Sequence, residues 1–165
     1  MPVAVADDPA DRPAWILETV ALLTQSAAAG RGRLLAAVAS APDADLVAGT
    51  DDAWGLGQIA THLLVSERGI AGIALRLARG EAVAASGQPR PGPAGISREG
   101  IAVLADKAEL AVARLRGEFP AAPDVRATAR HPYYGDLNAF GWLLTLPNHY
   151  LAHLEAFGRG LPSAL

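Results

Sequence analysis

Residues 140–157 read FGWLLTLPNHYLAHLEAF, and this stretch decides the fold. Five of its apolar or histidine side chains recur at intervals of four, three, four and four residues: Trp142, Leu146, His149, His153 and Phe157. At that spacing they share one side of an α-helix. Two histidines therefore interrupt an apolar side, where a buried imidazole needs partners for both ring nitrogens. The stretch predicts an amphipathic helix that turns its histidines toward a core, with a kink at Pro147.

Helical periodicity recurs in three other parts of the chain. Together with the first stretch, the expected helices cover 13–39, 56–79, 97–119 and 136–157. Ser97 and Asp136 are the expected N-caps of the last two helices. Gly30 and Gly32 could break the first helix.

The connections between these helices are rich in proline, glycine and aspartate, and they cover 41–53, 80–95 and 120–135. Residues 45–49 could form a short strand, but no other segment could pair with it. The sequence therefore predicts an all-α four-helix bundle. We expect a flexible N-terminal arm at 1–12 and a single domain at 13–165.

Composition limits the kind of function. Hydrophobic residues make up 51% of the 165 residues but aromatic residues only 5%, which suits closely packed helices built from Ala and Leu. The net charge of −3 comes from interspersed charges, so the basic patch of a nucleic-acid-binding protein is absent. A small metabolite is the more natural partner.

The chain contains no cysteine, which leaves histidines and carboxylates as the metal donors and is compatible with the cytoplasm, the location that we expect. Residues 137–154 carry no formally charged side chain and are long enough for a membrane span. Pro147, Asn148 and the two histidines argue against that interpretation, because burying such polar groups in lipid is costly.

His62 adds a third imidazole, because it lies beside the apolar stripe of the second helix. It is about seven residues, or roughly 10 Å, from the start of that helix. His153 and His149 are about five and nine residues, or roughly 7 and 13 Å, from the end of the last helix. The three rings lie at one level only if the two helices are antiparallel. An HxxxH pair alone is more often two ordinary histidines, so the metal hypothesis depends on this packing.

Three histidine ligands would leave a position open for water or substrate, as in catalytic rather than structural sites. Nitrogen donors suit Zn, Ni, Co or Fe, and the sequence does not choose among these divalent ions. Such an ion would activate water or a thiol. The alternative is a non-catalytic helical module that binds a ligand or partner and has no functional metal.

Two motifs resemble those of the DinB/YfiT-like superfamily of metal-binding four-helix bundles. The first is Trp54 followed by QIATHLL at 58–64, which contains His62; the second is His131-Pro132 with Gly135 and Leu137, followed by His149 and His153. The resemblance implies an up-down-down-up bundle with long crossover loops, a metal-binding histidine triad at His62, His149 and His153, and a homodimer. Some members are transferases or isomerases that use a low-molecular-weight thiol.

The resemblance leaves the reaction open. Members often carry Gln three residues after the last histidine, where this chain has Ala156. We expect a metal-dependent enzyme that acts on a small molecule, either as a thiol-dependent S-transferase or as a hydrolase. His131 is a weak candidate for a base and could equally be a loop residue that packs against the last helix. Glu67 or Glu155 could orient a ligand imidazole, although a surface charge is the simpler interpretation of each.

Overall fold

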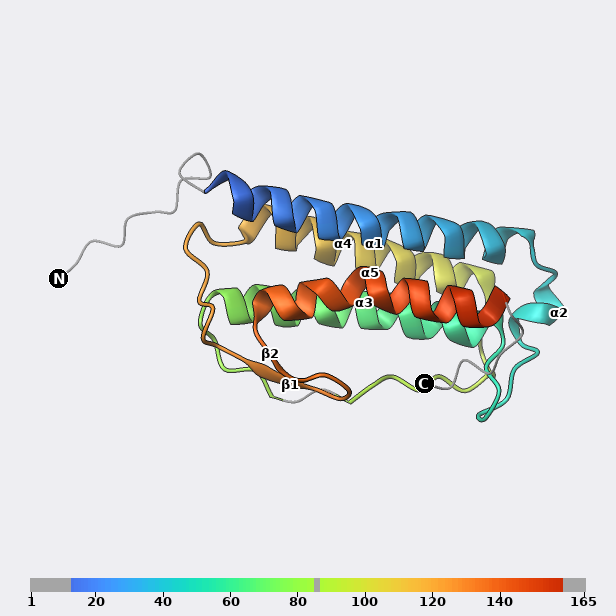
Figure 1. Cartoon of the computed structure of the whole chain (residues 1–165). Coiled ribbons are helices and arrows are strands. Elements are labelled where there is room, and N and C mark those ends of the chain that lie inside the picture. Colours follow the sequence, from blue (N-terminus) through green and yellow to red (C-terminus); the bar gives the residue numbers. More distant parts are fainter. Residues whose placement is uncertain (1–12, 85–86, 159–165) are drawn as a thin grey trace.

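The computed structural model describes residues 13–84 and 87–158 and contains four long helices (Figure 1). They are α1 (Ala14–Ser40), α3 (Leu56–Ala78), α4 (Arg98–Glu118) and α5 (Ala139–Gly158). The shorter elements are the helical turn α2 (Asp43–Leu46) and the strands β1 (Ala129–His131) and β2 (Gly135–Leu137). The expected N-terminal arm at 1–12 lies outside the described residues.

The helices form an up-down-down-up bundle, as expected. In Figure 1, α1 and α5 run in one direction and α3 and α4 in the other. The parallel pair α3 and α4 is joined by the crossover connection 79–97, which returns along the length of the bundle. Helix α3 packs against both α4 and α5, and it runs in the direction opposite to α5. The antiparallel pair that the metal hypothesis requires is therefore α3 and α5.

Small side chains let the helices approach closely. Ala27, Ala74, Ala108 and Ala139 have exposed fractions of 0%. Gly30 does not break α1, which is continuous; instead a Cβ at this position would lie 2.6 Å from Cβ of Tyr150 on α5. The absence of a side chain at this glycine is therefore what allows α1 and α5 to pack at this point.

The start of the last helix differs from the expectation. Asp136 is not its N-cap, because it lies in β2; instead Oδ1 of Asn138 accepts a hydrogen bond from the backbone N–H of Gly141. Ser97 is the N-cap of α4, as expected, and accepts from the N–H of Gly100.

The hairpin formed by β1 and β2 was not expected from the sequence. Its antiparallel strands have three residues each, which is too short to show an alternating pattern, and Gly135 has a positive φ of +77°. The indole N–H of Trp142 donates to the carbonyl of Ala129 at 3.2 Å and holds the hairpin against α5. Residues 45–49 form no strand, as the sequence indicated, and Asp45 and Leu46 belong to the helical turn α2.

A buried polar network connects α1, α3 and α5. Nη1 of Arg31 donates to Oε1 of Glu67 at 2.8 Å, and the hydroxyl of Tyr150 donates to Oε2 of the same carboxylate at 2.6 Å. Glu67 has an exposed fraction of 1%, so its interpretation as a surface charge was wrong. It also contacts no imidazole through a hydrogen bond, since its partners are Arg31 and Tyr150.

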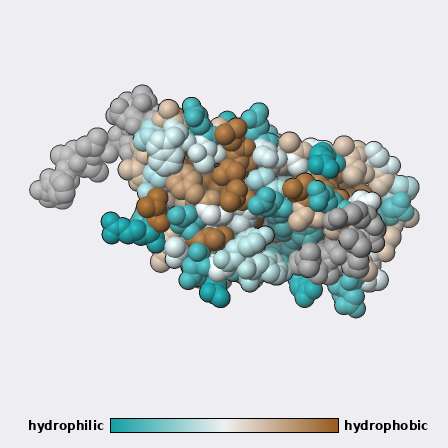
Figure 2. Space-filling view, in the orientation of Figure 1, coloured by the Kyte–Doolittle hydropathy of each residue, from teal (hydrophilic) through white to brown (hydrophobic). Residues whose placement is uncertain are grey.

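The face shown in Figure 2 carries hydrophobic residues among hydrophilic ones. The hydrophobic residues gather over the half of the molecule where α1 and α5 begin. Exposed large apolar side chains of these helices include Leu22, Leu144 and Leu151. Within residues 13–84 and 87–158, no helix is long and apolar enough to cross a membrane.

Candidate metal centre

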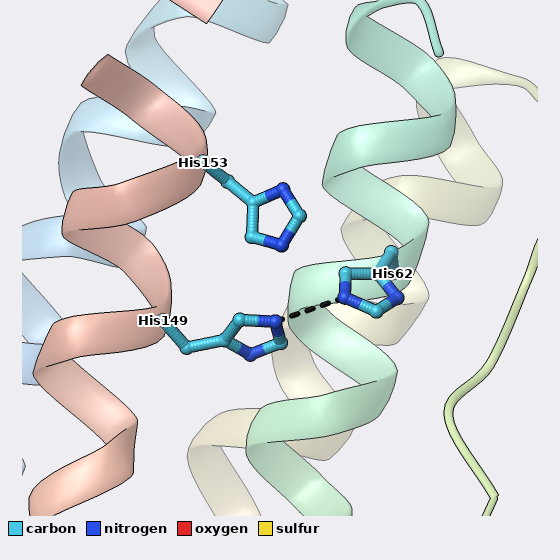
Figure 3. Close-up of side chains that lie close together, drawn as sticks. All are labelled: His62, His149 and His153. Atoms are coloured by element: carbon cyan, nitrogen blue, oxygen red, sulfur yellow. Dashed lines mark hydrogen bonds between the residues drawn. The ribbon is translucent and has the colours of Figure 1, made fainter. Parts of the chain in front are cut away.

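Three imidazoles meet between α3 and α5 at the predicted positions. His62 comes from α3, and His149 and His153 come from successive turns of α5; all three rings point into the space between the helices (Figure 3). One nitrogen from each ring lies within 4.8 Å of the other two. His62 and His153 are buried, with exposed fractions of 0% and 5%. The antiparallel packing therefore brings together residues that are 87 and 91 positions apart in the sequence.

A backbone carbonyl fixes the tautomer of His62. Nδ1 of His62 donates to the carbonyl oxygen of Pro89 at 2.7 Å, because a carbonyl can only accept. Its Nε2 therefore carries a lone pair and faces Nε2 of His149 at 2.9 Å, so that His149 donates in this hydrogen bond. If His149 moved its proton to Nδ1, both Nε2 atoms would offer lone pairs to one ion.

The crossover connection that supplies this carbonyl is itself held by Gln58. The side-chain amide of Gln58 donates to the carbonyls of Thr50 and Pro91, each at 3.0 Å, and its Oε1 accepts from the N–H of Gly55 at 3.2 Å. Gln58 has an exposed fraction of 0%. One buried amide thus joins the start of α3 to the segment that orients His62.

Trp54 covers the triad from the side of the loop before α3. Its ring stacks on that of His153 at an interplanar angle of 9° with centroids 6.4 Å apart, and its centroid lies 4.9 Å from that of His62. The exposed fraction of Trp54 is 7%. The tryptophan therefore keeps water away from one side of the histidine cluster.

The environment keeps the three rings uncharged at neutral pH. Burial, followed by the neighbouring His62 and His153, lowers the pKa of His149 to about 3. Burial and then His62 lower the pKa of His153 to about 4. Burial also lowers the pKa of His62, although the hydrogen bond to Pro89 opposes this shift. Neutral imidazoles are the form that binds metal ions.

The arrangement is compatible with a divalent metal ion. Two nitrogens bound to one ion at about 2.0–2.1 Å lie at most about 4.2 Å apart. The three donors lie within 4.8 Å of one another, so only small movements of the rings are needed. Three imidazoles match the preferences of Zn, Ni, Co and Fe, and the site could hold such an ion.

A cavity of about 680 Å³ lies beside the triad. Its walls come from α3, the crossover connection, the hairpin and α5, and His149 and His153 form part of them. The hydroxyl of Tyr133 donates to Oε1 of Gln88 at 3.2 Å, which links the hairpin to the crossover. A small molecule in this cavity would lie directly against the histidine cluster.

Comparison with known families decides the relationship. A family model described as the DinB superfamily matches residues 9–157. The chain belongs to the DinB superfamily. A solved structure, the crystal structure of TT2238, described as a four-helix bundle protein, is similar to this DinB chain with a TM-score of 0.64 and 26% identity, covering 85% of this chain and 98% of that one. A search of curated proteins found no match.

His131 lines the same cavity in this DinB protein, although it lies outside the triad. Its ring is buried, with an exposed fraction of 7%, between the rings of Tyr134 and Trp142, whose centroids each lie 4.8 Å away. Nδ1 accepts a hydrogen bond from the backbone N–H of Tyr133 at 3.2 Å. His131 therefore packs against α5, as one expectation had it, and lines the cavity, while a role as a base stays a prediction.

The supporting residues of this DinB site were missed by sequence reasoning. Trp54 and Gln58 were recognised only as parts of a motif, with no role predicted for either side chain. Nothing in the sequence indicated that the carbonyl of Pro89 would accept a hydrogen bond from His62. A proline-rich connection offers unpaired carbonyls because proline has no N–H. The proline content of this connection was therefore the one sequence feature that could have indicated a carbonyl available to a buried histidine. Ala156 lines the cavity and adds only a methyl group there. Glu155 is exposed.

Proposed function

We propose that His62, His149 and His153 hold one divalent metal ion and that the chain is a metal-dependent enzyme acting on a small molecule. One observation carries the proposal: three neutral imidazoles from two antiparallel helices converge beside a cavity of substrate size. Such convergence has no structural need, because apolar side chains would pack this part of the bundle without buried polar nitrogens.

The chain's own residues prepare the site. The carbonyl of Pro89 holds the proton of His62 on Nδ1 and so directs the lone pair of Nε2 toward His149. Trp54 restricts the ring of His153 and excludes water on that side. A divalent ion bound by imidazoles supplies Lewis acidity and increases the acidity of a coordinated water or thiol.

Two reaction classes suit this arrangement. In a thiol-dependent transfer, the sulfur of a low-molecular-weight thiol forms a bond to an electrophilic carbon of the substrate. The leaving group departs with the electron pair of the broken bond, and the thiol proton passes to solvent. In hydrolysis, the oxygen of water replaces the sulfur and the rest of the balance is the same. The family relationship and the cavity beside the triad support both classes.

Metal content tests the proposal. The untagged protein should contain close to one Zn, Ni, Co or Fe ion per chain, and His62→Ala and His153→Ala should both lose it. His131→Gln is the matched control, because it removes the fourth histidine without changing the triad. Unchanged metal content in the two triad variants would contradict the metal site.

Turnover separates an enzyme from a binding module. A panel of low-molecular-weight thiols with a halonitrobenzene tests the transfer reaction, and activated esters and amides test hydrolysis. We expect turnover in one of the two assays and its loss in His62→Ala. A chain that retains its ion but turns over none of these compounds would favour the alternative, a non-catalytic ligand- or partner-binding module.

The proposal includes a homodimer, as the resemblance implies, and a cytoplasmic location, with which the cysteine-free composition is compatible. The exposed Leu22, Leu144 and Leu151 on α1 and α5 offer apolar surface that a second copy could bury. Sedimentation equilibrium checks this part, and a monomer at micromolar concentrations would contradict it.

A further inference from the structure

The described residues that form the walls of the cavity carry no formal charge. Among the described residues that line it, none is Lys, Arg, Asp or Glu. Its apolar walls include Ile70, Ile73 and Trp142, and its polar side chains, such as Ser66 and Asn148, are uncharged. A ligand that fills this cavity exchanges water for apolar carbon over most of its surface.

Arginines close to the cavity in sequence do not enter it. Arg90 and Arg130 adjoin the lining residues Pro89 and His131, but both are exposed. Arg130 faces outward on β1, where it lies 3.9 Å from Asp136. Away from the triad, a carboxylate or phosphate placed among the described lining residues would lose its hydration without gaining a cationic side chain, which costs several kcal/mol.

His131 supplies the cavity with a hydrogen-bond donor. Because Nδ1 accepts from the N–H of Tyr133, the neutral ring carries its proton on Nε2. Nε2 has no hydrogen-bond partner among the described residues, and the ring is held by its contacts with Tyr134 and Trp142. A protonated ring would put a second proton against the Tyr133 N–H, so the geometry favours a donor over a base.

We infer that the cavity binds an uncharged, largely apolar molecule whose carbonyl or similar acceptor oxygen receives a hydrogen bond from Nε2 of His131. This inference rests on the proposed function, since it names the substrate class for the same site. It makes His131 a positioning residue, which orients the acceptor end of the ligand relative to the triad. An anionic group is costly against these walls except at the triad, where the proposed ion would be its partner.

Two fluorescent probes of similar size test the class. Prodan is an uncharged naphthalene with a carbonyl, and anilinonaphthalene sulfonate is an anion. Both are titrated against the full chain as purified and again after chelator treatment, with metal content measured in each sample. In the chelator-treated chain, where no ion attracts the sulfonate, we expect prodan to bind at least about tenfold more tightly than the sulfonate. Equal or tighter binding of the sulfonate in that sample would overturn the inference.

Variants locate the probe. Ile73→Trp fills the cavity and should weaken prodan binding at least about tenfold; Ser66→Phe on the same wall serves if the first variant does not fold. His131→Phe keeps an aromatic ring but removes the donor, so it should weaken binding about 2- to 12-fold and shift prodan emission to the blue. His131→Gln restores a donor and should return both values toward the wild type. Unchanged affinity in the filled variants, or unchanged affinity and emission in His131→Phe, would overturn the inference.

The two proposals fail separately. Lost preference for prodan in the chelator-treated chain overturns the inference about the ligand alone, because the metal content of the untreated chain is measured separately. Prodan binding as expected in a chain without a stoichiometric ion supports the inference about the cavity and contradicts the proposed metal function.

Discussion

Replacing Tyr150 with Phe removes one hydroxyl from the buried polar network that Tyr150 forms with Glu67 and Arg31. That hydroxyl donates to Glu67 at 2.6 Å, and the exposed fractions of Tyr150 and Glu67 are 2% and 1%. The phenyl ring keeps its packing against Gly30, so the lost interaction is the hydrogen bond to a buried carboxylate. Arg31 remains bonded to the other carboxylate oxygen.

A hydrogen bond to a charged group contributes about 1.5–3 kcal/mol. Water cannot replace the hydroxyl at a site with these exposed fractions, so we expect Tyr150→Phe to lower the free energy of unfolding by about that amount. For a domain of about 150 residues, each kcal/mol corresponds to roughly 2–4 °C, which predicts a fall in Tm of about 3–12 °C.

Urea unfolding followed by circular dichroism measures the change, with Tyr134→Phe as the matched control. The ring of Tyr134 is 62% exposed, so loss of its hydroxyl should change stability by less than about 0.5 kcal/mol. A double-mutant cycle with Glu67→Gln then isolates the pairwise term, which should be at least about 1 kcal/mol. If Tyr150→Phe and Tyr134→Phe had the same small effect, the network would not hold α5 against α3.

Three further predictions concern packing, pH and the crossover. Gly30→Ala should destabilise the chain by about 1–3 kcal/mol in urea titrations, because the new Cβ would lie 2.6 Å from Cβ of Tyr150. The control Gly32→Ala places its Cβ where no atom lies within 4 Å, and it should stabilise the chain by about 0.5–1 kcal/mol. Equal effects of the two variants would contradict the close approach of α1 and α5. Burial lowers the pKa of His131 from 6.5, so the imidazole binds a proton more readily in the unfolded chain than in the folded one. The stability that comes from the neutral His131 is therefore present above pH 6.5 and is lost as the pH falls toward the lowered pKa of the folded chain. His131→Phe should therefore lose stability on acidification less steeply than wild type, by up to about 1.4 kcal/mol per pH unit, and parallel curves would refute this. Gln58→Met leaves two backbone carbonyls without their donor and should lower both stability, by about 1–3 kcal/mol, and metal affinity measured by competitive chelation; unchanged affinity would show that the crossover does not orient the triad.

The sequence was sufficient for the parts of the fold that depend on local periodicity. The four long helices were predicted within a few residues, because apolar side chains repeat at helical spacing. The three imidazoles were predicted at one level if α3 and α5 are antiparallel, and the structure has that packing. His149 and His153 were the stronger part of this prediction, since two histidines on an apolar stripe need a reason to be there.

The rest depends on contacts between distant residues. Glu67 looked like a surface charge because its partners Arg31 and Tyr150 lie 36 and 83 positions away. The hairpin was missed because three-residue strands leave no periodic signal. The tautomer of His62 depends on a backbone carbonyl of Pro89, and backbone positions in a long connection cannot be inferred from side-chain patterns.

Anomalous diffraction from crystals of the untagged protein tests the metal site most directly, with data collected on both sides of the absorption edge of the ion found by elemental analysis. We predict one strong anomalous peak between α3 and α5, at about 2.0–2.1 Å from one nitrogen of each of His62, His149 and His153. A map without a peak there, with the His62 and His149 nitrogens still at hydrogen-bond distance, would contradict the metal centre and leave a DinB bundle with an apolar ligand cavity.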